Sequence, residues 1–369
     1  MNYLDFPRVG ERMYREVLED GLHVFVFPKP EFQKSYAFFA TNYGGMDLRF
    51  CLDGTWHDTP AGVAHYLEHK MFDTQEGNAL QKLTANGASP NAFTSNAITG
   101  YYFECTEQFE ENLKTLLSFV SVPYFTQESV DKEQGIIGQE IGMIEDDPDW
   151  KVFTNLMKGL YEHHPIRLSV AGSVESIARI TPQTLYDCHK AFYDPANMVL
   201  CVAGNQDPER GEAGLRQQLL GELACEVLLG NSTPLYAHLY QEGLINRNFS
   251  YGYDSVPGCA FLAAGGESRD PEAVRAAVEA EARRIEAEGV DPGLWDRVKK
   301  GVYGWRVRSL NSFETLCVNQ AQNFFAGREY LRFADLFADI RKEDVEALIA
   351  RWVTPARTSL SVIRPKEVG

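Results

Sequence analysis

The alternation of apolar and polar positions predicts a chain of short strands and amphipathic helices. Strands are predicted where β-branched and aromatic residues form apolar runs between turn residues. In the first two hundred residues these runs span 22–29, 35–50, 92–105 and 197–205. Gly44–Gly45 predicts a turn or bulge within the second run.

Helices are predicted where the apolar spacing changes to three or four residues. The clearest spans 59–73, because Thr59–Pro60 is a helix start signal and the apolar residues after it share one face. These residues are Val63, Leu67, Met71 and Phe72. Further helices are predicted at 79–91 (ending at Gly87), 111–125, 129–148, 152–161 and 181–193.

The second half follows a similar coarse order without a residue-level repeat. Its predicted helices include 215–230, 234–244 and 271–289, and its predicted strands are 248–256, 258–266 and a closing strand at 358–365. Asp207–Pro208 and the polar residues after it predict a linker. We therefore expect an α+β protein of two domains, 1–207 and 208–369.

Charge and composition narrow the range of functions. The chain carries 35 basic and 52 acidic residues, a net charge of −17, which disfavours nucleic acid as a partner. No apolar run approaches the ~18 residues of a membrane span, and the first residues lack the apolar core of a signal peptide. Seven scattered cysteines are typical of reduced thiols, so we expect a cytoplasmic protein.

One motif is typical of metal-binding sites. His65, Glu68 and His69 form an HxxEH pattern inside the helix predicted at 59–73. Histidines four residues apart lie on one helix face, so both imidazoles can bind one ion. Glu68 projects close to the same point, where it could take a proton from a metal-bound water. Catalytic zinc needs a third protein ligand, which must come from elsewhere in the chain.

The helix predicted at 129–148 offers that ligand. Glu133 and Glu140 are seven residues apart, two helical turns, and therefore lie on one face. One of the two could bind the metal while the other supports a histidine by a hydrogen bond. A solvated acidic face is the alternative reading of two glutamates on a helix.

These segments resemble the pitrilysin–insulinase family of inverted HxxEH zinc metallopeptidases. The resemblance runs through YGGMDLRF, TPAGVAHYLEHKMFD, GASPNAFTSNAITGYYFEC and VDKEQGIIGQEIGMIEDDPDW, in the family's order. It implies one zinc ion per chain, with His65, His69 and Glu140 as ligands. It also implies that Glu68 is the general base and that Glu133 supports a ligand.

The resemblance further implies a substrate-binding strand at Asn91, Ala92, Phe93 and Thr94. An extended peptide added to a sheet edge binds through main-chain hydrogen bonds. The expected activity is therefore zinc-dependent hydrolysis of peptides or unfolded segments.

The chain is most similar to a short bacterial subgroup related to processing peptidases. That similarity implies two similar mixed α/β halves and pairing, as a homodimer or with a related subunit. The second half is shortened here, since the expected division leaves it about 162 residues. By this resemblance, Tyr240 and Asn246 look like the positions where many relatives place a substrate-holding arginine and tyrosine. The alternative to an enzyme is thus a non-catalytic or partner-dependent peptide-binding subunit.

Overall fold

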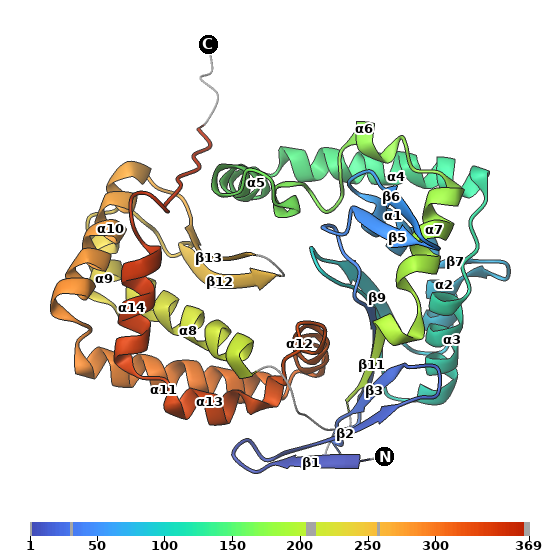
Figure 1. The fold of residues 1–369 in the computed structure, drawn as a ribbon, viewed down its shortest axis with the longest axis horizontal. Helices are drawn as coiled ribbons and strands as arrows, with labels where there is room; N and C mark the ends of the chain where they lie inside the picture. The colour runs from blue at the N-terminus through green and yellow to red at the C-terminus, as the bar shows by residue number, and fades with distance from the viewer. Residues whose placement is uncertain (1, 30–31, 204–211, 257–258, 365–369) are drawn as a thin grey trace. The chain divides into compact units, whose positions relative to one another are not determined.

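The computed structural model describes residues 2–29, 32–203, 212–256 and 259–364. The chain forms two compact units, Met1–Glu209 with Ser312–Phe325, and Arg210–Asn311 with Ala326–Gly369 (Figure 1). The linker predicted after Asp207, and with it the expected division at 207/208, falls largely on residues outside the described ranges. One helix of the second half, α12 (Phe313–Phe325), packs within unit 1.

The framework of unit 1 is a seven-stranded mixed sheet with the order β1-β2-β3-β11-β4-β10-β9. Its central strand β11 runs parallel to β3 and antiparallel to β4, and β9 forms one edge. The strands are β1 Asn2–Phe6, β2 Glu11–Val17, β3 His23–Val26, β4 Ser35–Thr41, β9 Ser89–Thr94, β10 Thr99–Cys105 and β11 Met198–Val202. Two small hairpins join β5 Arg49–Leu52 to β6 Thr55–Asp58, and β7 Asp73–Thr74 to β8 Gly77–Asn78.

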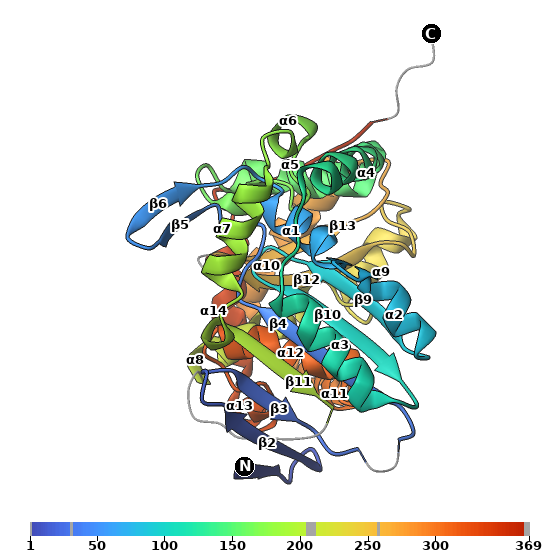
Figure 2. The ribbon, with the colours of Figure 1, turned by 90° about the vertical axis from the view of Figure 1, so that its right-hand side faces the viewer.

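Helices cover both faces of this sheet (Figures 1 and 2). α12 contacts β4 and β11 on one face, and Phe324 packs its ring against Phe25 of β3. On the opposite face, three helices contact β4, β9 or β10: α1 Val63–Met71, α2 Ala79–Ala85 and α3 Phe109–Ser121. The other helices of unit 1 are α4 Gln127–Asp146, α5 Pro148–Leu160, α6 Val174–Ile177 and α7 Pro182–Phe192, with 3₁₀ turns at Pro165–Arg167 and Pro195–Asn197.

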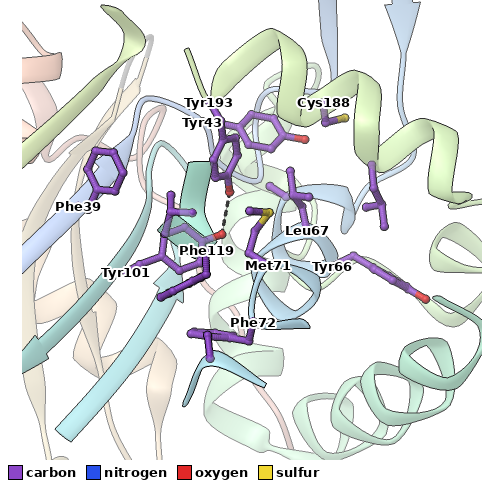
Figure 3. Close-up of a cluster of buried hydrophobic side chains, with 14 of the residues drawn as sticks. Phe39, Tyr43, Tyr66, Leu67, Met71, Phe72, Tyr101, Phe119, Cys188 and Tyr193 are labelled. Atoms are coloured by element: carbon purple, nitrogen blue, oxygen red, sulfur yellow. Dashed lines mark hydrogen bonds between the residues drawn. The ribbon is translucent and has the colours of Figure 1, made fainter. Parts of the chain in front are cut away.

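The core of unit 1 forms where α1 meets the sheet. Leu67 and Met71 of α1 are fully buried among aromatic rings from β10, α3 and the end of α7 (Figure 3). The hydroxyls of Tyr101 and Tyr193 satisfy each other there at 2.8 Å. Burial of this apolar stripe fixes α1 on the sheet.

Unit 2 is mostly helical in its described part. It contains α8 Glu212–Leu229, α9 Pro234–Gln241, α10 Pro271–Glu288, α11 Pro292–Ser309, α13 Phe333–Asp339, α14 Lys342–Trp352 and a 3₁₀ turn at Tyr330–Arg332. Its described strands, β12 Ser250–Val256 and β13 Cys259–Gly265, form one antiparallel pair. The mixed α/β class expected from the sequence is confirmed.

Two strand predictions were wrong, and some strands were missed. The run 92–105 is a hairpin of β9 and β10, because Ser95 accepts the amide of Ile98 through its hydroxyl and closes a turn. The closing strand predicted at 358–365 is irregular over its described residues, 358–364, where it pairs with no described strand. β1, β2 and β6 were not predicted. Their residues mix charged and apolar side chains without a buried run.

No helix among the described residues combines the length and apolarity needed to cross a bilayer.

Candidate metal centre

α1 presents the HxxEH motif because its other face is held by the core. The helix starts after Gly62, whose φ of 98° favours glycine, and a Cβ there would lie 2.7 Å from the carbonyl oxygen of Ala171. Burial of Val63, Leu67 and Met71 then sets the rotation of the helix. The predicted bounds of 59–73 shrink to Val63–Met71, and the motif lies inside them.

His65, His69 and Glu140 converge on one point. Nε2 of His65 lies 3.6 Å from Oε1 of Glu140, and Nε2 of His69 lies 3.6 Å from Oε2 of the same carboxylate. One ligand atom from each residue lies within 4.8 Å of the others. Tetrahedral ligands about 2 Å from zinc are roughly 3.3 Å apart, so this arrangement fits a zinc ion with one position left open.

Glu133 orients one of the two imidazoles. Its Oε1 lies 3.0 Å from Nδ1 of His69, which leaves Nε2 of that ring directed at Glu140. The two glutamates lie on one face of α4, as their spacing of seven predicts. Nδ1 of His65 is buried and has no hydrogen-bond partner in the described part of the chain.

Glu68 lies beside this cluster in a largely dry position. Glu68 is only 7% exposed, and its Oε2 accepts a hydrogen bond from the Thr94 hydroxyl at 2.6 Å. Burial raises the pKa of Glu68 above the ordinary value, although the Thr94 hydrogen bond and the His69 charge oppose that rise. A carboxylate with a raised pKa is a competent proton acceptor near neutral pH.

The two histidines have opposite pKa shifts. Burial, with the charge of His69, lowers the pKa of His65 to about 4, so this imidazole is neutral and can bind a metal. Burial alone would lower the pKa of His69. The Glu133 hydrogen bond and the charges of Glu68 and Glu140 outweigh burial, so the pKa of His69 is raised above its ordinary value. An excess of carboxylates at the cluster favours a cation there.

The predicted substrate segment is an edge of the sheet next to the cluster. Asn91, Ala92, Phe93 and Thr94 form the end of β9, which pairs with β10 on one side and contacts α1. Phe93 stacks on Phe38 with 5.9 Å between ring centroids. Their position at a sheet edge agrees with the expectation from the sequence.

Sequence reasoning missed the link between Thr94 and Glu68. Thr94 was singled out only as a substrate-facing residue, whereas its hydroxyl is a hydrogen-bond donor to the Glu68 carboxylate. Twenty-six positions separate the two residues. No periodicity within β9 or α1 could have indicated this contact.

The second-half positions noted in the sequence lie on the surface of unit 2. Tyr240 is 49% exposed and stacks on Tyr236 of the same helix. The Asn246 amide donates to Glu267 at 2.7 Å. Neither contact in itself indicates a substrate-holding role.

Comparison with known proteins finds relatives that are named zinc proteases. Residues 53–174 match the model of the insulinase family, peptidase family M16, and residues 179–223 match the M16 inactive domain. A relative described as the uncharacterized zinc protease YmfH of Bacillus subtilis (strain 168) is 32% identical over 98% of this chain and 99% of its own length. The chain belongs to the insulinase (M16) peptidase family.

Solved structures agree with this assignment. An M16-like peptidase from Alicyclobacillus acidocaldarius has a TM-score of 0.88 at 28% identity, covering 94% of this chain and 96% of that one. A protease from Helicobacter pylori has a TM-score of 0.81 at 15% identity, covering 94% and 98%, and shares the fold.

The alignment with YmfH contains positions that have no counterpart in this chain. It runs over 424 positions against 369 residues here, so at least 55 positions (424 less 369) pair with no residue of this chain.

Proposed function

We propose that this protein is a zinc-dependent endopeptidase that hydrolyses peptides or unfolded segments. The observation that carries the proposal is the approach of both histidine Nε2 atoms to one carboxylate, at 3.6 Å each. In this proposal His65, His69 and Glu140 hold one zinc ion and Glu133 holds His69 in its ligand tautomer. A zinc ion supplies a Lewis acid that polarises the peptide carbonyl and acidifies water.

Glu68 is the proposed general base. Thr94 occupies its Oε2, which leaves Oε1 to accept a proton from the attacking water. The water oxygen bonds to the carbonyl carbon, the carbon–nitrogen bond breaks, and Glu68 returns the proton to the leaving amine nitrogen. A positioned carboxylate contributes about 10²–10⁴-fold in such steps. Burial of Glu68 supports this role because it keeps bulk water from competing for the proton.

The proposed substrate is an extended peptide added alongside β9. This strand ends the sheet at Asn91–Thr94, so its outer edge can pair with a peptide backbone. Backbone pairing tolerates many side chains, and Thr94 joins this edge directly to the proposed base. A peptide bound there would lie next to α1, which contacts β9.

One observation supports a second candidate function, a partner-dependent peptide-binding subunit. The described strands of unit 2 form one pair, whereas unit 1 contains a seven-stranded sheet. A chain of this kind could need a second copy, or a related subunit, to complete its peptide-binding surface. Peptide cleavage by the isolated chain, compared across protein concentrations, separates the two functions. A rate per chain that rises with dimer formation would favour the partner-dependent form.

The direct test is peptide cleavage with and without a chelator, using the parent, Glu68→Gln and Glu76→Gln. Glu76 is an exposed matched control, with its side chain 85% exposed. We expect chelator-sensitive cleavage by the parent and Glu76→Gln, and a loss of at least 10²-fold in Glu68→Gln with zinc content retained. Parent-like cleavage by zinc-loaded Glu68→Gln would contradict the proposed role.

A further inference from the structure

A fully buried lysine follows the second histidine of the motif. Lys70 has a side-chain exposure of 0%, and its ammonium is paired with Asp73, the first residue of β7. The same ammonium donates to the carbonyl oxygen of Ser129 at 3.3 Å. Lys70 thus connects α1 to the first turn of α4.

Tyr66 makes a parallel connection one helical turn earlier. Its buried hydroxyl donates to the carbonyl oxygen of Val130, the residue after Ser129. Tyr66 and Lys70 are four residues apart, as are His65 and His69, so the two pairs lie on adjacent stripes of α1. Because both pairs belong to one helix, the contacts of Tyr66 and Lys70 with α4 also fix where His65 and His69 lie relative to α4.

The two carbonyls that these side chains contact lie in the turn of α4 that leads to Glu133. In an α-helix the carbonyl of residue i accepts the amide of residue i+4, so Ser129 is paired with Glu133 and Val130 with Gln134. Lys70 and Tyr66 therefore hold the turn from which Glu133 projects toward His69. Glu140 follows on the same face two turns later.

Packing alone does not require a charge at position 70. Removing an ammonium from water is costly, and replacing a buried ion pair by apolar side chains of similar volume is often neutral or stabilising. Ion pairing with Asp73 offsets that cost only in part, since the Asp73 side chain is itself 39% exposed. The advantage of Lys70 over methionine is then the fixed geometry between α1 and α4.

We propose that Lys70 and Tyr66 are positioning residues that set the distance from the histidines of α1 to Glu133 and Glu140. This inference rests on the proposed zinc site and adds the element that holds it together. It predicts that the site loosens when these contacts are removed, although unit 1 stays folded.

The test compares zinc affinity and thermal stability in the full chain. Lys70→Met removes the charge, Tyr66→Phe removes only the hydroxyl, and Lys114→Met is the control because its side chain is 68% exposed on α3. Zinc affinity is measured by competition with a chromophoric chelator, and the melting temperature is measured without metal. Cobalt-substituted samples report ligand geometry through their visible absorption.

We expect Lys70→Met to bind zinc about 10–100-fold more weakly, with an unchanged or higher metal-free melting temperature and an altered cobalt spectrum. With saturating zinc, kcat should fall while KM is unchanged. Zinc affinity within twofold of the parent would overturn the inference. If Lys70→Met does not fold, Tyr66→Phe decides by the same criterion. A parent that binds no zinc would instead contradict the proposed function itself, and the inference with it.

Discussion

The hydroxyl of Thr94, the last residue of β9, donates to Oε2 of Glu68 at 2.6 Å. The strand proposed to bind the peptide backbone and the helix that carries the proposed base therefore meet in one hydrogen bond. Such a contact can hold the base in place while leaving its second oxygen available.

Replacing Thr94 by valine tests this contact. The hydrogen bond lowers the pKa of Glu68, so its loss should raise that pKa further. Glu68 must be ionised to accept a proton, and the acid limb of kcat/KM should therefore move to higher pH. We expect roughly a tenfold lower kcat/KM at pH 6 and a smaller loss at pH 8. Thr94→Ser keeps the hydroxyl and should retain the parent profile, whereas an unshifted Thr94→Val profile would contradict the coupling.

Replacing Glu133 by glutamine tests the support of His69. The variant loses a charge-assisted hydrogen bond at Nδ1 of His69, and its zinc affinity should fall about 10–100-fold. Activity should recover in part when zinc is raised, because the three proposed ligands remain. The control is Glu128→Gln, an exposed glutamate in the first turn of the same helix. Equal zinc affinity in both variants would contradict the role of Glu133.

Asp47 provides a prediction on stability and pH. Burial raises its pKa from 3.8 to about 6, despite the hydrogen bond that its carboxylate accepts from the amide of Gly44 at 2.8 Å. The folded state binds this proton more tightly than the unfolded state, so the contribution of Asp47 to stability is lost as pH rises through 6.

Asp47→Asn keeps an acceptor for Gly44 and removes the charge. Its free energy of unfolding should exceed that of the parent by up to about 3 kcal/mol at pH 7.5, and the difference should vanish as pH falls toward 4. Urea denaturation across this range measures the difference. Asp20→Asn, at an exposed residue that also accepts a backbone amide, should show no such trend. A pH-independent difference for Asp47→Asn would refute the assignment.

Two glycines should respond in opposite directions to alanine. A Cβ on Gly100 of β10 would lie 2.3 Å from Cε2 of the buried Phe38, so Gly100→Ala should cost about 1–3 kcal/mol. A Cβ on Gly135 of α4 meets nothing within 4 Å, and Gly135→Ala should stabilise the helix by about 0.5–1 kcal/mol. Denaturation midpoints measure both effects, and shifts of the same sign would contradict the packing described at Phe38.

Local patterns predicted the elements that carry the site. The spacing of Val63, Leu67 and Met71 encodes α1, and the same period places His65 and His69 on the opposite side. A seven-residue interval likewise places Glu133 and Glu140 on one face of α4. Periodicity is sufficient here because each relationship lies within one helix.

Such patterns could not predict contacts between different helices and strands. Lys70 is fully buried in α1, and its contact with the Ser129 carbonyl of α4 joins two helices, so no period within α1 could indicate it. The run 92–105 has strand propensity throughout, and its division into β9 and β10 depends on the turn that Ser95 closes. The expected closing strand at 358–365 has suitable residues, yet a strand also needs a neighbour.

Zinc content after gel filtration tests the central claim most directly, with the parent compared to Glu140→Gln. The account predicts one zinc ion per parent chain and a content well below one in the variant, since a carboxylate ligand is lost while His65 and His69 stay in place. A parent chain without zinc, or a variant that retains the full content, would contradict the convergence of these three side chains on one metal ion.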